Sequence, residues 1–202
     1  LSPQKYKDIT NFKLDKILMV IKKLKKYNFF KIKINVVPID ISKEDISDLV
    51  DYTQENDIKL RFIEMMPIGY GNRFNFISSD EIISMISEKY GDYKRSEKVH
   101  GNGPAVYFSF FKLKTEIGFI SAMSHMFCDS CNRVRISCDG KIKPCLNYEY
   151  SVDIRKMMLQ GVDEETIVNK IADTIYNKPK SHSFLEGLLD NSEMKSMYQI
   201  GG

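Results

Sequence analysis

The spacing of apolar and polar residues in the first third of the chain predicts two helices and two strands. Apolar residues recur every three or four positions over 14–27 with lysines between them, which is typical of an amphipathic helix. Segments 31–37 and 58–65 favour strands, and segment 42–55 between them begins with Ser42, a good N-cap residue. This order predicts two parallel strands joined by a right-handed crossover.

Polar side chains interrupt these two predicted strands. Alternate isoleucine and valine residues of segment 31–37 share one face, so Lys33 and Asn35 lie on the other, and Arg61 lies in the second strand. Strands of a parallel sheet are usually buried on both faces, so the presence of these polar side chains requires an explanation. Two interpretations stay open, a structural hydrogen bond or a site for phosphate and ribose groups.

The pattern changes after segment 67–75, which is rich in glycine, asparagine and proline and predicts a boundary loop. Beyond it we expect a helix over 79–90 with Ser79 at its start, and a hairpin of strands 105–111 and 115–121. Helices are predicted over 153–159 and 163–176, and no long periodic run follows position 178.

All four cysteines lie within positions 128–145. Cys128 and Cys131 are two residues apart, and Cys145 follows thirteen residues later. Between them, segment 133–138 alternates polar and apolar residues and Asp139-Gly140 favours a tight turn, so a hairpin should return Cys145 to the first two thiols. Cys138 shares its face with apolar neighbours, which predicts a buried, structural cysteine.

Spacing and residue type allow four interpretations of the cysteines. A disulfide framework is disfavoured because few cysteines are clustered without a secretory signal, and a thioredoxin-like motif leaves the third cysteine unexplained. A structural zinc site with Cys138 or His125 as fourth ligand and an iron–sulfur cluster on three thiolates both remain open. Arg133 and Arg135 favour the cluster. They could bind an anionic substrate beside an open metal position, whereas a closed zinc site does not need their positive charge.

Composition and net charge narrow the possible classes of ligand and the expected cellular location. The 202 residues are 43% hydrophobic and 28% charged, with net charge +3, which is ordinary for one or two globular domains. The charge suits a small polyanion better than nucleic acid, and no apolar run approaches the ~18 residues of a membrane span. We therefore expect a cytoplasmic protein without nucleic-acid or membrane partners.

Four motifs resemble one enzyme family. Segment 127–146, FCDSCNRVRISCDGKIKPCL, resembles the carboxy-terminal cluster segment of the GTP 3′,8-cyclase family, radical-SAM lyases of molybdenum cofactor biosynthesis. KINVV at 33–37, RFIEMMP at 61–67 and IGG at 200–202 resemble its other signatures in the same order. The family's amino-terminal Cys-x-x-x-Cys-x-x-Cys has no counterpart here, so we expect the carboxy-terminal portion of a longer enzyme, inactive by itself.

The resemblance implies a fold in two parts. Residues 1–75 would be the carboxy-terminal part of a partial (β/α) radical-SAM barrel, and residues 76–202 an α+β auxiliary [4Fe–4S] domain with a carboxy-terminal tail. S-adenosylmethionine and a second [4Fe–4S] cluster would belong to the missing amino-terminal part. A cyclic pyranopterin synthase would act downstream, and a homodimer stays open.

The resemblance also implies roles for individual residues. Three thiolates would hold a [4Fe–4S] cluster whose open iron takes the guanine: Cys128, Cys131 and Cys145. Arg133 and Arg135 would orient GTP and its intermediates. The remaining expected contacts are Lys33, Asn35 and Arg61 for the nucleotide, Met66 for S-adenosylmethionine, and Gly201 and Gly202 in a tail needed for turnover.

Two other classes compete with this interpretation. One is a zinc-ribbon module that binds nucleic acid or is purely structural, with all four cysteines as ligands and the arginines on the nucleic acid. The other is a radical-SAM protein whose auxiliary cluster serves a peptide substrate, against which the nucleotide signatures at Lys33, Arg61 and the tail argue.

Overall fold

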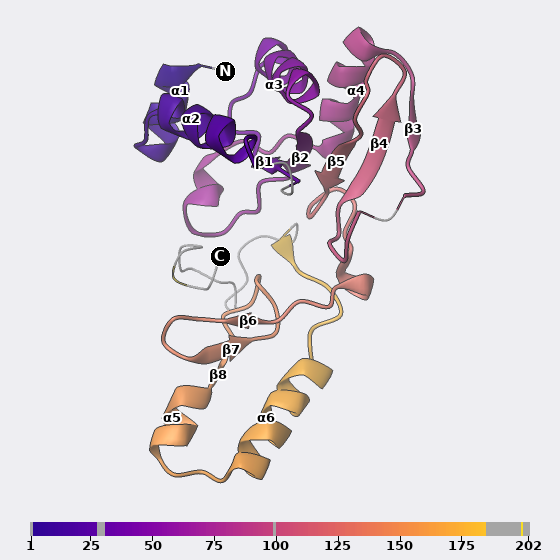
Figure 1. Cartoon of the computed structure of the whole chain (residues 1–202). Helices are drawn as coiled ribbons and strands as arrows, with labels where there is room; N and C mark the ends of the chain where they lie inside the picture. Colours follow the sequence, from indigo (N-terminus) through magenta and orange to yellow (C-terminus); the bar gives the residue numbers. More distant parts are fainter. Residues whose placement is uncertain (1, 28–30, 99, 185–198, 200–202) are drawn as a thin grey trace. The chain divides into compact units, whose positions relative to one another are not determined.

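The computed structural model of the chain describes residues 2–27, 31–98, 100–184 and 199. Its contacts divide the chain into two compact units, Leu1–Met65 with Phe76–Ser124, and Met66–Asn75 with His125–Gly202, each with its own sheet (Figure 1). The predicted α/β class is confirmed. The assignment of 1–75 to a barrel and of 76–202 to a cluster domain stays a prediction.

A five-stranded mixed sheet organises the first unit, in the order β1-β2-β5-β4-β3. Parallel pairing of β1 with β2, expected from the crossover, is confirmed, and β5 continues the parallel part on the other side of β2. β4 pairs antiparallel with β5 and β3, so the predicted hairpin is also confirmed. The strands are β1 (Lys33–Val36), β2 (Lys59–Ile63), β3 (Tyr93–Arg95), β4 (Val106–Phe110) and β5 (Ile117–Ile120).

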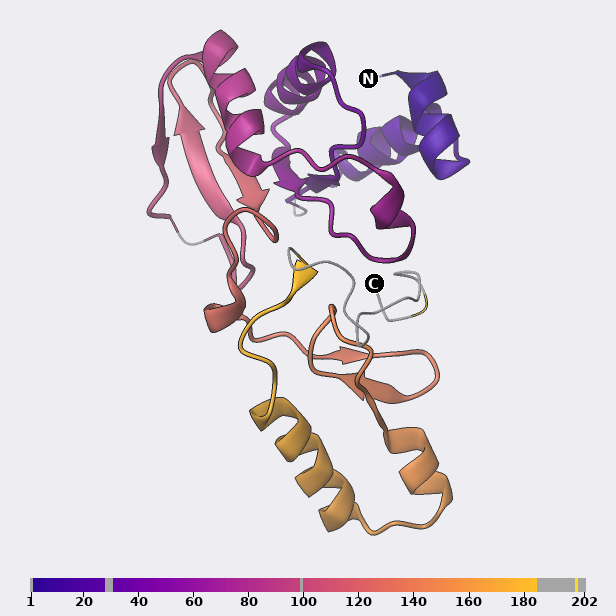
Figure 2. The same cartoon turned by 180° about the vertical axis from the view of Figure 1, so that it is seen from behind.

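Two helices, α3 (Lys43–Glu55) and α4 (Ser79–Tyr90), pack on one face of this sheet and close the core (Figure 2). Leu60 and Phe62 of β2 and Phe119 of β5 point into it, and the rings of Phe62 and Phe119 stack at 5.7 Å. Each such buried side chain contributes roughly 1.5–3 kcal/mol. Because strand residues alternate, Lys59, Arg61 and Gly118 lie on the opposite face.

Both core helices begin with a capping box. Ser42 accepts from the Asp45 amide while the Asp45 carboxylate accepts from the Ser42 amide, as predicted for α3. For α4 the predicted cap was wrong by one residue. Ser78 is the N-cap, because the glutamate that completes the box, Glu81, stands three positions after it.

Glu64, directly after β2, is a buried carboxylate held by hydrogen bonds from two other segments. It is 2% exposed. Its oxygens accept from the backbone amides of Ser79 at 2.7 Å, Met123 at 2.7 Å and Ser124 at 2.9 Å, and from the Ser124 hydroxyl. Burial raises the pKa of Glu64, but these four donors outweigh it and hold the pKa below its ordinary value.

Two helices precede the first strand. The predicted amphipathic helix is confirmed as α2 (Leu14–Leu24), while α1 (Pro3–Thr10), capped by Ser2, was not predicted. None of the described helices has the length and apolarity needed to cross a membrane.

The second unit has a three-stranded antiparallel sheet, β6-β7-β8, followed by two helices. Asp153 and Asp163 cap the helices, and both helices were predicted. The elements are β6 (Arg135–Ile136), β7 (Lys141–Lys143), β8 (Val152–Asp153), α5 (Ile154–Leu159) and α6 (Glu164–Tyr176), with short 3₁₀ helices at Gly69–Arg73 and Cys128–Ser130.

We expect Glu64→Gln to lower the free energy of unfolding by about 3 kcal/mol at pH 7, because the new amide places N–H donors against backbone N–H donors. Since the folded pKa of Glu64 is depressed, the wild-type advantage is complete above pH ~4.3 and declines as the pH falls through the folded pKa. Urea unfolding followed by circular dichroism from pH 3 to 7 measures both effects.

Glu88→Gln is the matched control, since it makes the same change in an exposed ion pair with Lys43 and should leave stability nearly unchanged. Equal stability of the Glu64→Gln and wild-type proteins, or a difference that does not vary between pH 7 and pH 3, would contradict the role assigned to Glu64.

Candidate functional site

The cysteine hairpin of the second unit is present but shorter than predicted. Arg135 pairs with Lys143 and Ile136 with Ile142, and the strands then separate at a turn over positions 137–140. The turn needs Gly140, which has φ +79°, and a Cβ there would stand 2.6 Å from the Cβ of Arg155. The hairpin prediction is confirmed, with four turn residues in place of two.

The prediction that Cys138 is a buried structural cysteine was wrong, because its side chain is exposed. The physical reason is the longer turn. Cys138 leaves the strand and stands at the second turn position, so the strand alternation used to place it no longer applies there.

The other three cysteines are half-buried free thiols. The Cys131 amide donates to the Cys128 carbonyl at 3.1 Å, which closes the Cys-x-x-Cys loop, and the Arg135 guanidinium interacts electrostatically with both Cys131 and Cys145. Among the described residues, no three His, Cys, Asp or Glu side chains are grouped to hold a metal ion. The thiols have the donor chemistry of a metal site, but their predicted convergence is not formed.

Two arginines accompany these thiols. The Arg133 guanidinium lies 5.7 Å from the Phe127 ring centre in a cation–π contact and is exposed. Arg135 is half-buried, and burial together with the nearby Arg133 charge lowers the pKa of its guanidinium. Arginine stays protonated at neutral pH, so the pair gives the hairpin an excess of positive charge.

Lys178, just after α6, is a contact of the cysteine loop that sequence reasoning missed. Its ammonium donates to the Cys131 carbonyl at 3.0 Å and the Arg133 carbonyl at 2.9 Å, and lies 3.1 Å from the Cys131 sulfur. Burial raises the pKa of Cys131, but a hydrogen bond from the Arg133 backbone and the charge of Lys178 outweigh it, so the pKa is lowered. No local pattern marked Lys178, because 47 positions separate it from Cys131.

The predicted nucleotide residues of the first unit share one face of its sheet. Asn35 and Arg61 are paired in the β1–β2 register, and the Arg61 Nε donates to the Asn35 Oδ1 at 2.7 Å. Gly118 beside them leaves room for this arrangement, since a Cβ there would meet the Arg61 Cγ at 2.9 Å. Lys33 stands at the start of β1 on the same face and donates to the His100 carbonyl at 3.1 Å.

His100 is a second residue that sequence reasoning missed. Its ring lies between Lys59 and Glu116, with Nδ1 2.8 Å from the Lys59 ammonium and Nε2 2.6 Å from a Glu116 oxygen. The position follows a strand not predicted, β3, and precedes the Gly101–Asn102–Gly103 turn, so no periodic pattern placed it.

The remaining predicted residues are Met66 and His125 within the described part of the chain, and two glycines outside it. Met66 is half-buried in the loop assigned to the second unit, and His125 is exposed. Gly201 and Gly202 lie outside the described residues. The predicted role of each of these residues stays a prediction.

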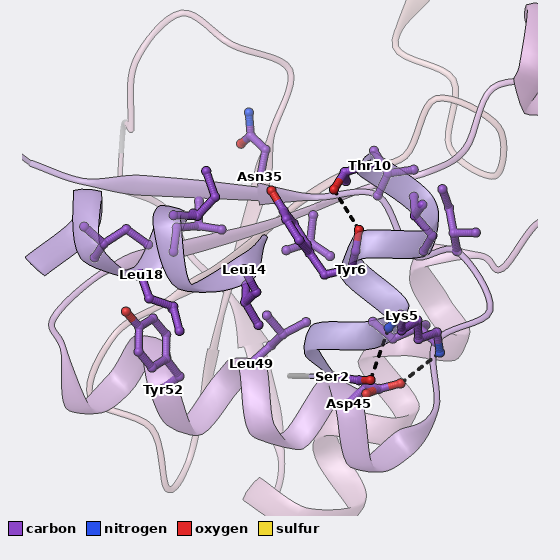
Figure 3. Close-up of a pocket in the computed structure, with 18 residues that line it drawn as sticks. Ser2, Lys5, Tyr6, Thr10, Leu14, Leu18, Asn35, Asp45, Leu49 and Tyr52 are labelled. Carbon is purple, nitrogen blue, oxygen red and sulfur yellow. Dashed lines mark hydrogen bonds and ion pairs between the residues drawn. The ribbon is translucent and has the colours of Figure 1, made fainter. Parts of the chain in front are cut away.

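A separate cavity of about 410 Å³ lies among α1, α2, β1 and α3 (Figure 3). Leu14, Leu18 and Leu49 are among its largely aliphatic lining, and its charged members, Lys5 and Asp45, neutralise each other at 3.1 Å. The cavity is therefore unsuited to a polyanion.

These observations define an α/β protein of two units, one with a cationic sheet face and the other with a thiol-rich hairpin beside two arginines. The chain belongs to the Molybdenum Cofactor Synthesis C family, whose model matches residues 58–184. This match includes β2, the β4–β5 hairpin, all four cysteines and Lys178.

Similar proteins with the name GTP 3′,8-cyclase match the chain over its whole length. The chain is 40% identical over 204 residues to the protein of Clostridium perfringens (strain 13 / Type A). It is 34% identical over 207 residues to that of Desulforamulus reducens and 35% identical over 212 residues to that of Listeria monocytogenes serotype 4b. The chain spans 62 to 63% of the length of these relatives.

We expect Lys178→Gln to slow alkylation of Cys131 by iodoacetamide at neutral pH in metal-free protein. The substitution removes an ammonium that favours the thiolate, so the pKa of Cys131 should rise and the rate should reach its midpoint at higher pH. Mass spectrometry of the Cys131 peptide across pH 6–10 measures this. Lys180→Gln, an exposed neighbour, is the matched control, and an unchanged midpoint in Lys178→Gln would contradict the contact.

Proposed function

We propose that this chain is the carboxy-terminal part of a GTP 3′,8-cyclase, a radical-SAM lyase that converts GTP into the cyclic pyranopterin precursor of the molybdenum cofactor. The observation that carries the proposal is the match of the whole chain, at 34 to 40% identity, to relatives with that name. The family match and the position of the cationic residues agree with a phosphate-bearing substrate.

In this proposal Cys128, Cys131 and Cys145 hold a [4Fe–4S] cluster. The spacing of the three cysteines, their half-buried position and two adjacent arginines support the choice of these residues. When bound, such a cluster supplies an iron that can accept a nitrogen or oxygen atom of the substrate. Convergence of the thiols would accompany loading, because metal binding and local folding are coupled.

The protein's own side chains bind and orient the nucleotide. Arg133 and Arg135 donate charge-assisted hydrogen bonds to GTP and its intermediates, worth roughly 1.5–3 kcal/mol each. Lys33 offsets phosphate charge, and Asn35 and Arg61, already hydrogen-bonded to each other, face the same side of the sheet for ribose or phosphate oxygens.

Further parts of the proposal come from the family alone. The sheet of the first unit would belong to a (β/α) barrel, and S-adenosylmethionine with a second cluster would be held by the portion of the protein that the relatives have beyond this chain. Met66 would contact S-adenosylmethionine, and Gly201 and Gly202 would reach the reacting groups. The free thiols favour a reducing, cytoplasmic setting, and a cyclic pyranopterin synthase would take up the product.

The zinc-ribbon alternative is not favoured by the family match. In the version with all four cysteines as ligands it would also need Cys138, and this residue is exposed in the turn.

We expect anaerobic reconstitution to give a brown protein with about four irons and four sulfides per three-cysteine site. Cys145→Ala should lose this iron, whereas Cys138→Ala should keep it, because Cys138 is outside the proposed ligand set. Iron, zinc and acid-labile sulfide analysis of both variants measures the difference. One stoichiometric zinc in place of iron, or dependence of the metal on Cys138, would overturn the cluster assignment.

We expect Arg133→Ala and Arg135→Ala to weaken GTP binding by about ten- to a hundredfold in the protein that carries this chain, since each removes charge-assisted hydrogen bonds. Calorimetric titration with GTP measures the affinity. Arg95→Ala, which removes an exposed arginine of β3, is the control and should leave it unchanged. Wild-type affinity in both variants would return Arg133 and Arg135 to a structural role.

A further inference from the structure

A chain of polar contacts on the sheet of the first unit joins residues that the proposed function does not use. Lys59 lies directly beside Lys33 in the β1–β2 register. Its ammonium contacts His100 Nδ1 at 2.8 Å. An ammonium has only donors, so Nδ1 must be an acceptor, which leaves the proton of neutral His100 on Nε2.

The other side of the ring faces Glu116. His100 Nε2 and Glu116 Oε2 are 2.6 Å apart, an ion-pair distance at which the N–H is not aligned as a hydrogen bond. The Ser96 hydroxyl donates to the second Glu116 oxygen at 2.7 Å, which fixes the carboxylate. Side-chain exposures of 8% for His100 and 13% for Glu116 keep this pair away from bulk water.

Stacking on the Tyr107 ring fixes the plane of the His100 imidazole. The rings of His100 and Tyr107 stack with centres 3.9 Å apart and planes 29° apart. Tyr107 is 4% exposed, and its hydroxyl has no hydrogen-bond partner among the described residues. Buried hydroxyls normally find a partner in protein, water or ligand, so this group has spare hydrogen-bonding capacity.

Positive charge around Lys59 exceeds negative charge. Burial lowers the pKa of Lys59, the charges of Lys33, Lys31 and Lys98 lower it further, and Glu116 opposes them. Lys33, Lys31 and Lys98 act on Lys59, while Lys59, Tyr107 and Glu116 contact the His100 ring. A cluster of this kind favours an anion as its further partner.

We infer that His100 is a positioning residue that controls, through its own protonation, whether the Lys59 ammonium is available to the phosphate chain of a bound nucleotide. With neutral His100, Lys59 is held at Nδ1 and Lys33 is held at the His100 carbonyl. Protonation converts Nδ1 from an acceptor to a donor, so Lys59 is released beside Lys33, and Glu116 balances the new imidazolium charge. The inference rests on the proposed function, because that function supplies the phosphate ligand.

The direction of the pH effect follows from these contacts. Protonation of His100 adds one positive charge to the site and frees the Lys59 ammonium, so a polyphosphate should bind more tightly at lower pH. His100→Gln cannot titrate, while its amide oxygen can still accept from Lys59, so this variant should stay in the high-pH state.

Calorimetric titration with inorganic tripolyphosphate between pH 5.5 and 8 tests the inference in the protein that carries this chain. At pH 8, wild type and His100→Gln should bind within about twofold of each other. At pH 6 wild type should bind about fivefold more tightly than His100→Gln, the size of one exposed charge pair. The change of ligand protonation is common to both proteins and cancels in this ratio.

Two further variants separate positioning from folding. Lys59→Gln keeps His100 but removes the ammonium that protonation releases, so most of the pH response should disappear. Lys43→Gln removes an exposed ammonium that pairs with Glu88 at 2.8 Å on α3 and α4, outside this cluster, and should keep the response. The same pH dependence in wild type and His100→Gln overturns the inference, as does its loss in Lys43→Gln alone.

GTP titrations of the same proteins distinguish this inference from the proposed function. If Lys33→Ala weakens GTP binding while His100→Gln follows the wild-type pH profile, the His100 inference fails and the proposed function stands. If wild type binds neither GTP nor tripolyphosphate, both fail together. Thermal unfolding of every variant confirms that the comparison is made on folded protein.

Discussion

The first unit depends on a charge that cannot reach water. Glu64 ends the central strand β2, and its carboxylate ties the first turn of α4 to the segment after β5. A buried carboxylate is tolerated only when donors surround it, and here three of the four donors are backbone amides, one of which, Ser79, would otherwise lack a partner at a helix start. The same interaction therefore satisfies the helix, fixes the strand end and orders the segment leading towards the cysteines.

The opposite face of the same sheet follows from strand alternation. With Leu60 and Phe62 committed to the core, Lys59 and Arg61 have to stand on the other side. Gly118 on the neighbouring strand leaves that side shallow, so the Arg61 side chain can lie across the sheet. The burial of Leu60 and Phe62 thus produces an ordered cationic surface on the other face of the sheet. In the second unit Arg133, Arg135 and Lys178 likewise place positive charge around the thiols.

Sequence reasoning succeeded where a local pattern decides the outcome. Ser42 as a cap, the parallel β1–β2 pair and the cysteine hairpin all follow from periodicity or turn chemistry. It failed where one hydrogen bond shifts a boundary, as with Ser79, or where a longer turn moves a residue out of a strand, as with Cys138.

The site was only partly predictable for a different reason. Lys33, Arg61 and the arginines beside the cysteines were recognisable because they interrupt or flank strong patterns. His100 and Lys178 were not recognisable from the sequence. Each is linked to the site by contacts with residues distant in the sequence, and the spacing of residues carries no information about such contacts. The thiol arrangement was unpredictable in detail because spacing limits how far apart the cysteines can lie but does not fix where each side chain points.

The lysines of β1 also affect how this strand can pair with another strand. Among the described residues β1 is the outermost strand of its sheet, and an outermost strand is a place where another segment, of the same protein or of a second copy, can pair. Lys33 within the strand and Lys31 just before it are exposed, and like charges on two approaching edges repel. The residues that make this face attractive to a small anion therefore also make it repellent to a second copy of itself.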